Sequence, residues 1–183
     1  MSESATDNIL EILTDKTNIE SALTIISLGD DVKKRIRKSF ILKLEDSLRP
    51  MLEQYDLIFD KRELEGMTIL SPNYSSINVI RRGKPSPAFS LQVESGRVYY
   101  GLSVNADERN PEKKTIRQPL WQKPNETWPH GWSYLPGDLQ YWHGNEALVD
   151  MANGHQIIDT IKEELKRAMD LGAFDDIDKL LCL

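Results

Sequence analysis

The chain has little of what disulfide-stabilised, metal-bound or membrane-spanning proteins need. Cys182 is the one cysteine among 183 residues, so neither a disulfide framework nor a cysteine zinc cluster can form within one chain. No apolar run approaches the roughly 18 residues of a membrane span. The first residues, MSESATDN, lack the basic and apolar segments of a secretory signal. We therefore expect a cytoplasmic protein without a membrane partner.

Common catalytic and cofactor-binding motifs are absent too. There is no GxxxxGK[ST] or GxGxxG phosphate loop, no GxSxG nucleophile elbow and no HExxH metal motif. The three histidines, His130, His143 and His155, are 13 and 12 positions apart, unlike the i, i+4 spacing of a helical metal site. We expect no cofactor and no catalytic residue.

The balance of charge is acidic, with one basic run. A net charge of −6 disfavours non-specific adhesion to nucleic acid or membranes. The run "KKRIRK" opens a predicted helix, where cations oppose the helix dipole, so it is a candidate for contacts with phosphate or an acidic partner. The simpler interpretation is a solvated face whose charge nearby aspartates balance. The candidate residues are Lys33, Lys34, Arg37 and Lys38.

Helical periodicity dominates the first third. Residues 6–28 are predicted to be helical, with Asp15 or Thr17 as a cap between two segments and Gly29 as the end. Asp30 or Asp31 then caps a long helix, in which apolar residues recur every four positions from Val32 to Leu48. Pro50 predicts a break or kink near Leu48 or Arg49.

From residue 67 the pattern alternates, as in strands. "MTIL" and "INVIR" predict short strands, and "AFSLQVESGRVYYGLSV" predicts a hairpin with its turn at "SG". Phe89, Leu91 and Val93 share one face of it, and Ser90, Gln92 and Glu94 the other. Residues 105–136 are predicted to be irregular, and "LQYW" at 139–142 to be a further short strand. Helices are predicted at 146–151 and 155–172, with a last turn in the tail.

These patterns predict an α+β fold. An antiparallel sheet of about four or five strands packs against N-terminal and C-terminal helices, in a single domain spanning residues 1–183. Residues 1–30 could form a small helical appendage.

The segment "WPHGWSYLPGDLQYWHG", residues 128–144, is unusually rich in tryptophan and histidine. Large aromatic side chains can anchor an irregular segment to its domain. Alternatively they form a face that stacks on bases or binds a partner protein. The candidate anchoring or contact residues are Trp121, Trp128, Trp132, Tyr134 and Trp142. A third interpretation is a metal site formed by His130, Asp138 and His143.

Several pieces, taken in order, resemble the C-terminal region of bacterial proteins of the PD-(D/E)XK nuclease superfamily. They are "VKKRIRKSFILKLEDSLRPML", "FSLQVESGRVYYGLSV", "WSYL" followed by "LQYW", and the helix after "LVDMANGHQ". The resemblance spans about residues 8–172.

The nuclease core of that superfamily is missing from this chain. It holds Mg²⁺ with an aspartate and with an acidic residue two positions before a lysine, on neighbouring strands. Here there is no Pro-Asp dipeptide, and Asp31, Asp60 and Glu112, which precede basic residues at that spacing, do not fall on a suitable strand pair. The resemblance implies an accessory region without the nuclease.

We therefore expect a non-catalytic binding or accessory domain of a bacterial or phage cytoplasm. Its partner would be a protein or a nucleic acid, in a nucleic-acid-processing or defence system. The alternative is a metal-dependent hydrolase that uses the histidines and aspartates of residues 130–155.

Overall fold

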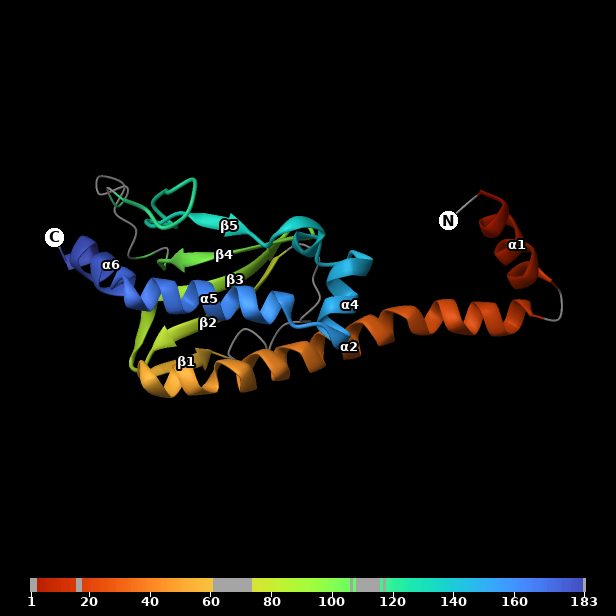
Figure 1. Ribbon diagram of the computed structural model, residues 1–183, viewed down its shortest axis with the longest axis horizontal. Coiled ribbons are helices and arrows are strands. Elements are labelled where there is room, and N and C mark those ends of the chain that lie inside the picture. The colour runs from red at the N-terminus through yellow and green to blue at the C-terminus, as the bar shows by residue number, and fades with distance from the viewer. Residues whose placement is uncertain are drawn as a thin grey trace.

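The computed structural model describes residues 3–15, 18–60, 74–105, 107, 116 and 118–182. It has the α+β fold that the sequence predicts (Figure 1). The helices and strands, in chain order, are α1 (Glu3–Thr14), α2 (Ile19–Gln54), β1 (Leu57–Asp60), β2 (Tyr74–Arg81), β3 (Lys84–Glu94), β4 (Arg97–Ser103), β5 (Trp132–Tyr134), the 3₁₀ helix η2 (Gly137–Gln140), α4 (Asn145–Asn153), α5 (Gln156–Asp170) and α6 (Ala173–Cys182).

The five strands form one antiparallel sheet in the order β1-β2-β3-β4-β5, so each strand pairs with its neighbour in the chain. The predicted hairpin is its centre, with Val93 opposite Val98 and Phe89 opposite Leu102. Ser95 and Gly96 have φ angles of 50° and 75°. Left-handed backbone at both central residues is typical of the tight turn that matches strand twist. "SG" is therefore the hairpin turn.

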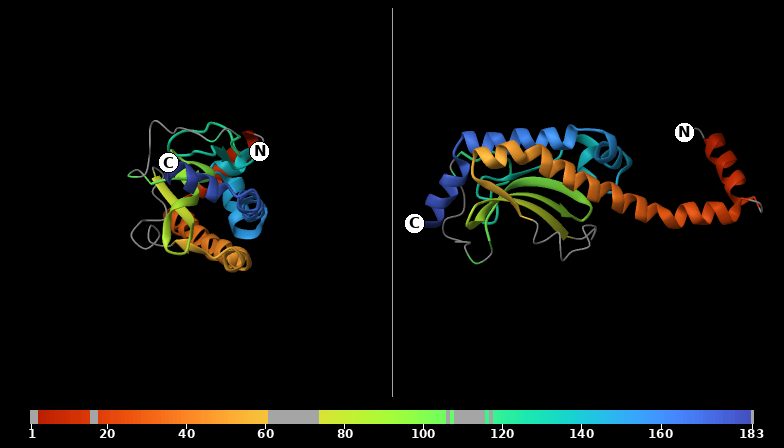
Figure 2. Two further views of the ribbon diagram at one scale, coloured as in Figure 1. Left: turned by 90° about the vertical axis from the view of Figure 1, so that its left-hand side faces the viewer. Right: turned by 90° about the horizontal axis from the view of Figure 1, so that it is seen from below.

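The hydrophobic core lies on one face of the sheet, beneath α2 and α5 (Figure 2). The alternation in β3 turns Phe89, Leu91 and Val93 toward it. From the helices come Phe40 and Leu44 of α2, and further side chains of α5. Burying each such side chain fully contributes about 1.5–3 kcal/mol.

The opposite face of the central strands is polar yet also buried. Ser90 and Gln92 are 3% and 6% exposed. The Ser90 hydroxyl donates to Asn78 Oδ1 at 2.6 Å and lies 2.7 Å from the Ser103 hydroxyl. Because hydrogen bonds offset the cost of burying polar groups, a second, polar layer forms on this face.

The long helix differs from the prediction at both ends. α2 begins after Asn18, rather than at Asp30 or Asp31, and runs through Gly29 without ending there. A helical glycine costs only about 1 kcal/mol relative to alanine, which neighbouring helix formers can offset. Pro50 also lies inside α2, which continues to Gln54. Little helix follows the proline, so little is lost there.

Elsewhere most predicted helices and strands are present, but their boundaries differ from the prediction. The first two residues of "LQYW", predicted as a strand at 139–142, belong to the 3₁₀ helix η2, and Tyr141 makes an isolated β-bridge with Arg97. The edge strand is β5, from "WSY". The predicted helices at 146–151 and 155–172 are present as α4 and α5, and the tail forms the ten-residue α6. The predicted strand "MTIL" lies outside the described residues.

One part of the chain stands away from the body. In two views, α1 and the first half of α2 extend beyond the sheet and its covering helices, with α1 turned across the far end (Figures 1 and 2). We call α1 together with residues 19–35 of α2 the arm. None of the helices described combines the length and apolarity needed to cross a bilayer.

Candidate functional site: an aromatic pocket beside the hairpin turn

A pocket of ≈ 490 Å³ opens where the β3–β4 turn, β5 and the loop before β5 meet. It combines four aromatic rings with two charged side chains of opposite sign and an amide. Its lining residues are Glu94, Ser95, Arg97, Tyr99, Asn125, Trp128, Trp132 and Tyr134.

Strand register explains why three of these aromatic residues share a face. Tyr99 of β4 is directly opposite Tyr134 of β5. Trp132 lies two residues before Tyr134, and a two-residue step along a strand returns to the same face. Tyr100 points to the other face, where it packs against Trp121 in the core.

The rings contact one another as a cluster around Tyr99. Its centroid lies 5.5 Å from that of Trp128, 5.1 Å from that of Trp132 and 6.2 Å from that of Tyr134. Trp132 and Tyr134 meet edge to face at 5.0 Å. Such edge contacts are favourable geometries for aromatic pairs, so the rings support one another.

The loop before β5 is held in place by the Asn125 side chain and by its close approach to β4. Asn125 Oδ1 accepts hydrogen bonds from the backbone N–H groups of Thr127 and Trp128, at 2.9 and 3.0 Å. A Cβ on Gly101 would lie 2.6 Å from the Gly131 carbonyl oxygen and 3.0 Å from a Trp128 ring carbon. Glycine at position 101 therefore lets the loop and Trp128 lie directly on β4.

Charged groups surround the rings. Lys123 Nζ lies 4.7 Å from the centroid of Trp132, and Arg97 Cζ lies 5.5 Å from that of Tyr134. Both distances suit cation–π contacts. On the other side, Tyr99 donates its hydroxyl to Glu94 Oε2 at 3.0 Å. The pocket thus offers aromatic faces, the Arg97 guanidinium, one carboxylate and an amide to a ligand, and the Lys123 ammonium lies beside it over Trp132.

The structure separates the five candidate aromatic residues into two groups. Trp128, Trp132 and Tyr134 line the pocket, whereas Trp121 and Trp142 belong to the core on the other face. Trp121 Nε1 donates to Glu164 Oε2 of α5 at 2.8 Å, and Trp142 packs edge-on against Phe40 of α2. These two indoles anchor the segment to the helices.

The basic run lies on α2, the helix that covers the core face. Lys33 and Lys34 pair with Asp30 and Asp31 at 3.8 and 3.7 Å. Lys38 is exposed. The run therefore contributes nothing to the aromatic pocket.

Arg37 differs from the other residues of the basic run. Its side chain is only 4% exposed, and its guanidinium donates to His143 Nδ1. Burial lowers the pKa of Arg37, against the attraction of Asp30. Expected as a surface contact for phosphate, Arg37 instead joins the base of the arm to the loop before α4.

The histidines do not gather around a metal site. His130 is 3% exposed, and burial lowers its pKa, opposed by Asp176 and the Ala173 backbone. Burial also lowers the pKa of His143, helped by the nearby Arg37 and Lys33. Within the described ranges, no three His, Cys, Asp or Glu side chains lie together so that they could hold an ion. His130, Asp138 and His143 therefore form no such group.

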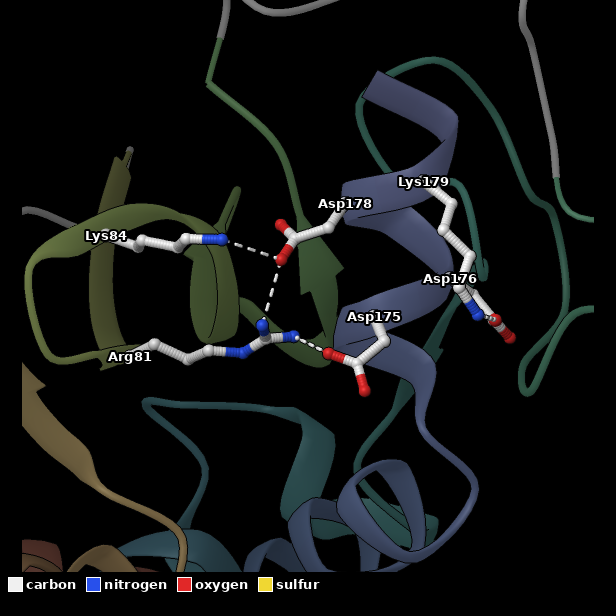
Figure 3. Close-up of polar contacts among 6 residues, drawn as sticks. All are labelled: Arg81, Lys84, Asp175, Asp176, Asp178 and Lys179. Atoms are coloured by element: carbon white, nitrogen blue, oxygen red, sulfur yellow. Dashed lines mark hydrogen bonds and ion pairs between the residues drawn. The ribbon is translucent and has the colours of Figure 1, made fainter. Parts of the chain in front are cut away.

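A cluster of charged residues joins α6 to the turn between β2 and β3 (Figure 3). Arg81 reaches two carboxylates, Asp175 through Nη2 and Asp178 through Nη1, each at 2.9 Å. Lys84 Nζ also binds Asp178, at 3.0 Å. Because Asp178 is bound by both Arg81 and Lys84, the cluster suits holding α6 in place rather than binding a ligand.

Reasoning from the sequence missed five of the eight residues that line the pocket. Glu94, Ser95, Arg97, Tyr99 and Asn125 were not among the candidates. A signal for one was present: if Val98, Tyr100 and Leu102 face the core, alternation turns Tyr99 outward. The approach of β5 and its loop to that face carries no comparable local signal.

Comparison with known proteins gives no identification. No family, no curated protein and no solved structure matches this chain.

Proposed function

We propose that the chain is a non-catalytic binding domain that holds an unpaired base and its phosphates, from single-stranded nucleic acid, in the aromatic pocket. One observation carries the proposal. Four aromatic rings and two cations meet around a ≈ 490 Å³ pocket on the sheet face away from the core.

Stacking would supply most of the binding energy. Trp132 and Tyr134 are only half-buried, so a ligand can reach them. A base stacked on an aromatic side chain gains about 1–3 kcal/mol, whatever its sequence. A base that lies on Trp132 displaces the Lys123 ammonium from the ring and leaves it free to pair with a phosphate.

Two polar groups can meet the edge of a base. Asn125 Oδ1 is engaged by two backbone N–H groups, so the amide offers a ligand its nitrogen as a donor. The Glu94 carboxylate can accept from a base amino group, as acidic side chains do from cytosine. These groups would orient the base between the rings.

The cations near the pocket set the expected salt dependence. The net charge of −6 opposes binding at long range. If Arg97 and Lys123 each neutralise one phosphate, the logarithm of the binding constant falls with the logarithm of salt concentration with a slope of about −1.4. A strong basic-patch binder would give a much steeper slope.

In this proposal the domain serves a separately encoded nuclease or related enzyme. Support for that part comes from the order of helix, hairpin, tryptophan segment and helix that resembles the accessory region of such proteins.

Fluorescence anisotropy of a labelled single-stranded oligonucleotide at low salt tests the proposal. Trp132→Ala should weaken binding by about tenfold, and Trp132→Phe, which keeps a ring, by much less. Lys123→Ala should weaken binding and flatten the salt slope. Lys34→Ala, a matched loss of charge on α2, should change neither. No binding by the unaltered chain, or equal losses for Lys34→Ala and Lys123→Ala, would contradict the proposal.

A further inference from the structure

The arm exposes more apolar surface than a solitary helix should. Leu23, Leu28 and Val32 of α2 are 58%, 50% and 53% exposed, and Ile12 of α1 is 61% exposed. Leu28 and Val32 are four residues apart, so they lie one above the other on a single helix face. Leu28 and Val32 thus form a small exposed apolar patch on one face of the arm, and such a patch can mark an interaction surface.

Charge along the arm is divided between its two ends. The end far from the body is acidic, with exposed side chains at Asp7, Glu11, Asp15 and Glu20. The end next to the body is net basic: Lys33, Lys34 and Arg35 are exposed there and outnumber Asp30 and Asp31, with which Lys33 and Lys34 pair at 3.8 and 3.7 Å.

We infer that the arm pairs with the arm of a second copy of this chain, antiparallel and around a two-fold axis. Antiparallel alignment puts the acidic end of each arm beside the basic end of the other. Parallel alignment would put like charges together. A two-fold dimer requires a surface that is complementary to itself, and the antiparallel arm meets this requirement.

Gly29 gives independent support. A Cβ at this position would meet nothing within 4 Å in its own chain. Glycine inside a helix costs about 1 kcal/mol relative to alanine, and nothing within the chain requires it here. The distance between packed helices depends on the side chains between them, so a glycine lets a second helix approach closely.

The arm is long enough for such a pairing. Residues 19–35 of α2 extend about 26 Å at 1.5 Å per residue. Residues from Phe40 onward bury their apolar face in the domain core, so the second copy would occupy only the projecting half.

Sedimentation velocity of the full chain over a range of concentrations tests the inference. We expect a dimer, which Leu28→Glu combined with Val32→Glu converts to a monomer. The matched control is Leu171→Glu, because Leu171 is 60% exposed but lies on the body. It should leave the dimer intact. A monomeric unaltered chain, or a dimer that survives the Leu28 and Val32 changes, overturns the inference.

Two charge-reversal variants test whether charge aligns the two arms antiparallel. One variant carries Lys33→Glu, Lys34→Glu and Arg35→Glu, and the other carries Glu11→Lys, Asp15→Lys and Glu20→Lys. Each alone should dimerise at least about tenfold more weakly than the unaltered chain at low salt. Their equimolar mixture should recover dimerisation, because one arm is then net acidic at both ends and the other net basic at both ends. Unimpaired dimers of each variant alone, or no recovery on mixing, would show that charge does not align the arms. Circular dichroism checks that all variants remain helical.

Discussion

At the scale of single residues, the pocket depends on two neighbours in β4 that face opposite ways. Tyr100 packs against Phe89 and Trp121 in the core, while Tyr99 meets the pocket rings. Gly101 then gives the loop of Trp128 room to lie on the strand. A sequence shows which strand residues alternate, but a close approach by a loop thirty residues away depends on tertiary packing.

The pair of Arg37 and His143 gives a prediction for pH. Arg37 can donate only to a neutral His143 ring, and burial and nearby cations lower the pKa of His143 in the folded state. As pH falls, the His143 ring is therefore protonated at a higher pH in the unfolded chain than in the folded one. Stability is highest above the ordinary histidine pKa of about 6.5 and declines below it.

Urea unfolding at about pH 7.5 and pH 5.5 measures this decline. His143→Gln keeps an acceptor for Arg37 but cannot titrate, so the loss of unfolding free energy on acidification should shrink. His155→Gln, a control at an exposed position, should leave the loss unchanged. If both variants lose as much stability as the unaltered chain, the pair does not sense pH.

At the scale of elements, α6 is held by the charged cluster of Figure 3 as well as by its apolar face. Phe174 and Ile177 are buried, and Arg81 lies over the Phe174 ring at 5.3 Å. The Arg81 and Asp178 side chains are 22% and 23% exposed. Removing one partner of an ion pair that is partly shielded from water costs more than removing one from an exposed pair, because the other charge is left uncompensated.

Replacing Arg81 should therefore loosen α6. Arg81→Met should lower the unfolding free energy by about 1–2 kcal/mol, because Asp175 loses its partner and Asp178 keeps only Lys84. Lys179→Met is the control, since the Lys179–Asp176 pair is exposed. It should change stability by less than about 0.5 kcal/mol. Chemical denaturation measures both, and equal effects would contradict this role for Arg81.

Elements with strong periodicity could be predicted from the sequence. The β3–β4 hairpin, α5 and the apolar stripe of α2 follow from local alternation or a four-residue repeat. β5 could not be predicted, because "WSY" is only three residues long and depends on pairing with β4. Gly29 was predicted to end a helix and Pro50 to break or kink one, but α2 continues through both. Tertiary and helical context outweighed their low helix propensity.

At the scale of the whole molecule, the chain presents two surfaces with different chemistry. The pocket lies on the body, on the sheet face away from α2. The arm extends beyond the body (Figure 1). The sequence predicted the α+β body and candidate aromatic residues. It could not show that Trp128 and Trp132 belong to the pocket while Trp121 and Trp142 belong to the core, because that division follows from which face of the sheet each loop reaches.

That division makes the four indole groups reporters of the proposed binding site. Their Nε1–H signals can be followed separately by ¹⁵N NMR and assigned with single Trp→Phe variants. When a single-stranded oligonucleotide is added at low salt, the signals of Trp128 and Trp132 should shift in a saturable way, and those of Trp121 and Trp142 should stay. Unmoved signals throughout, or shifts that centre on Trp121 and Trp142, would contradict the assignment of the pocket as the site.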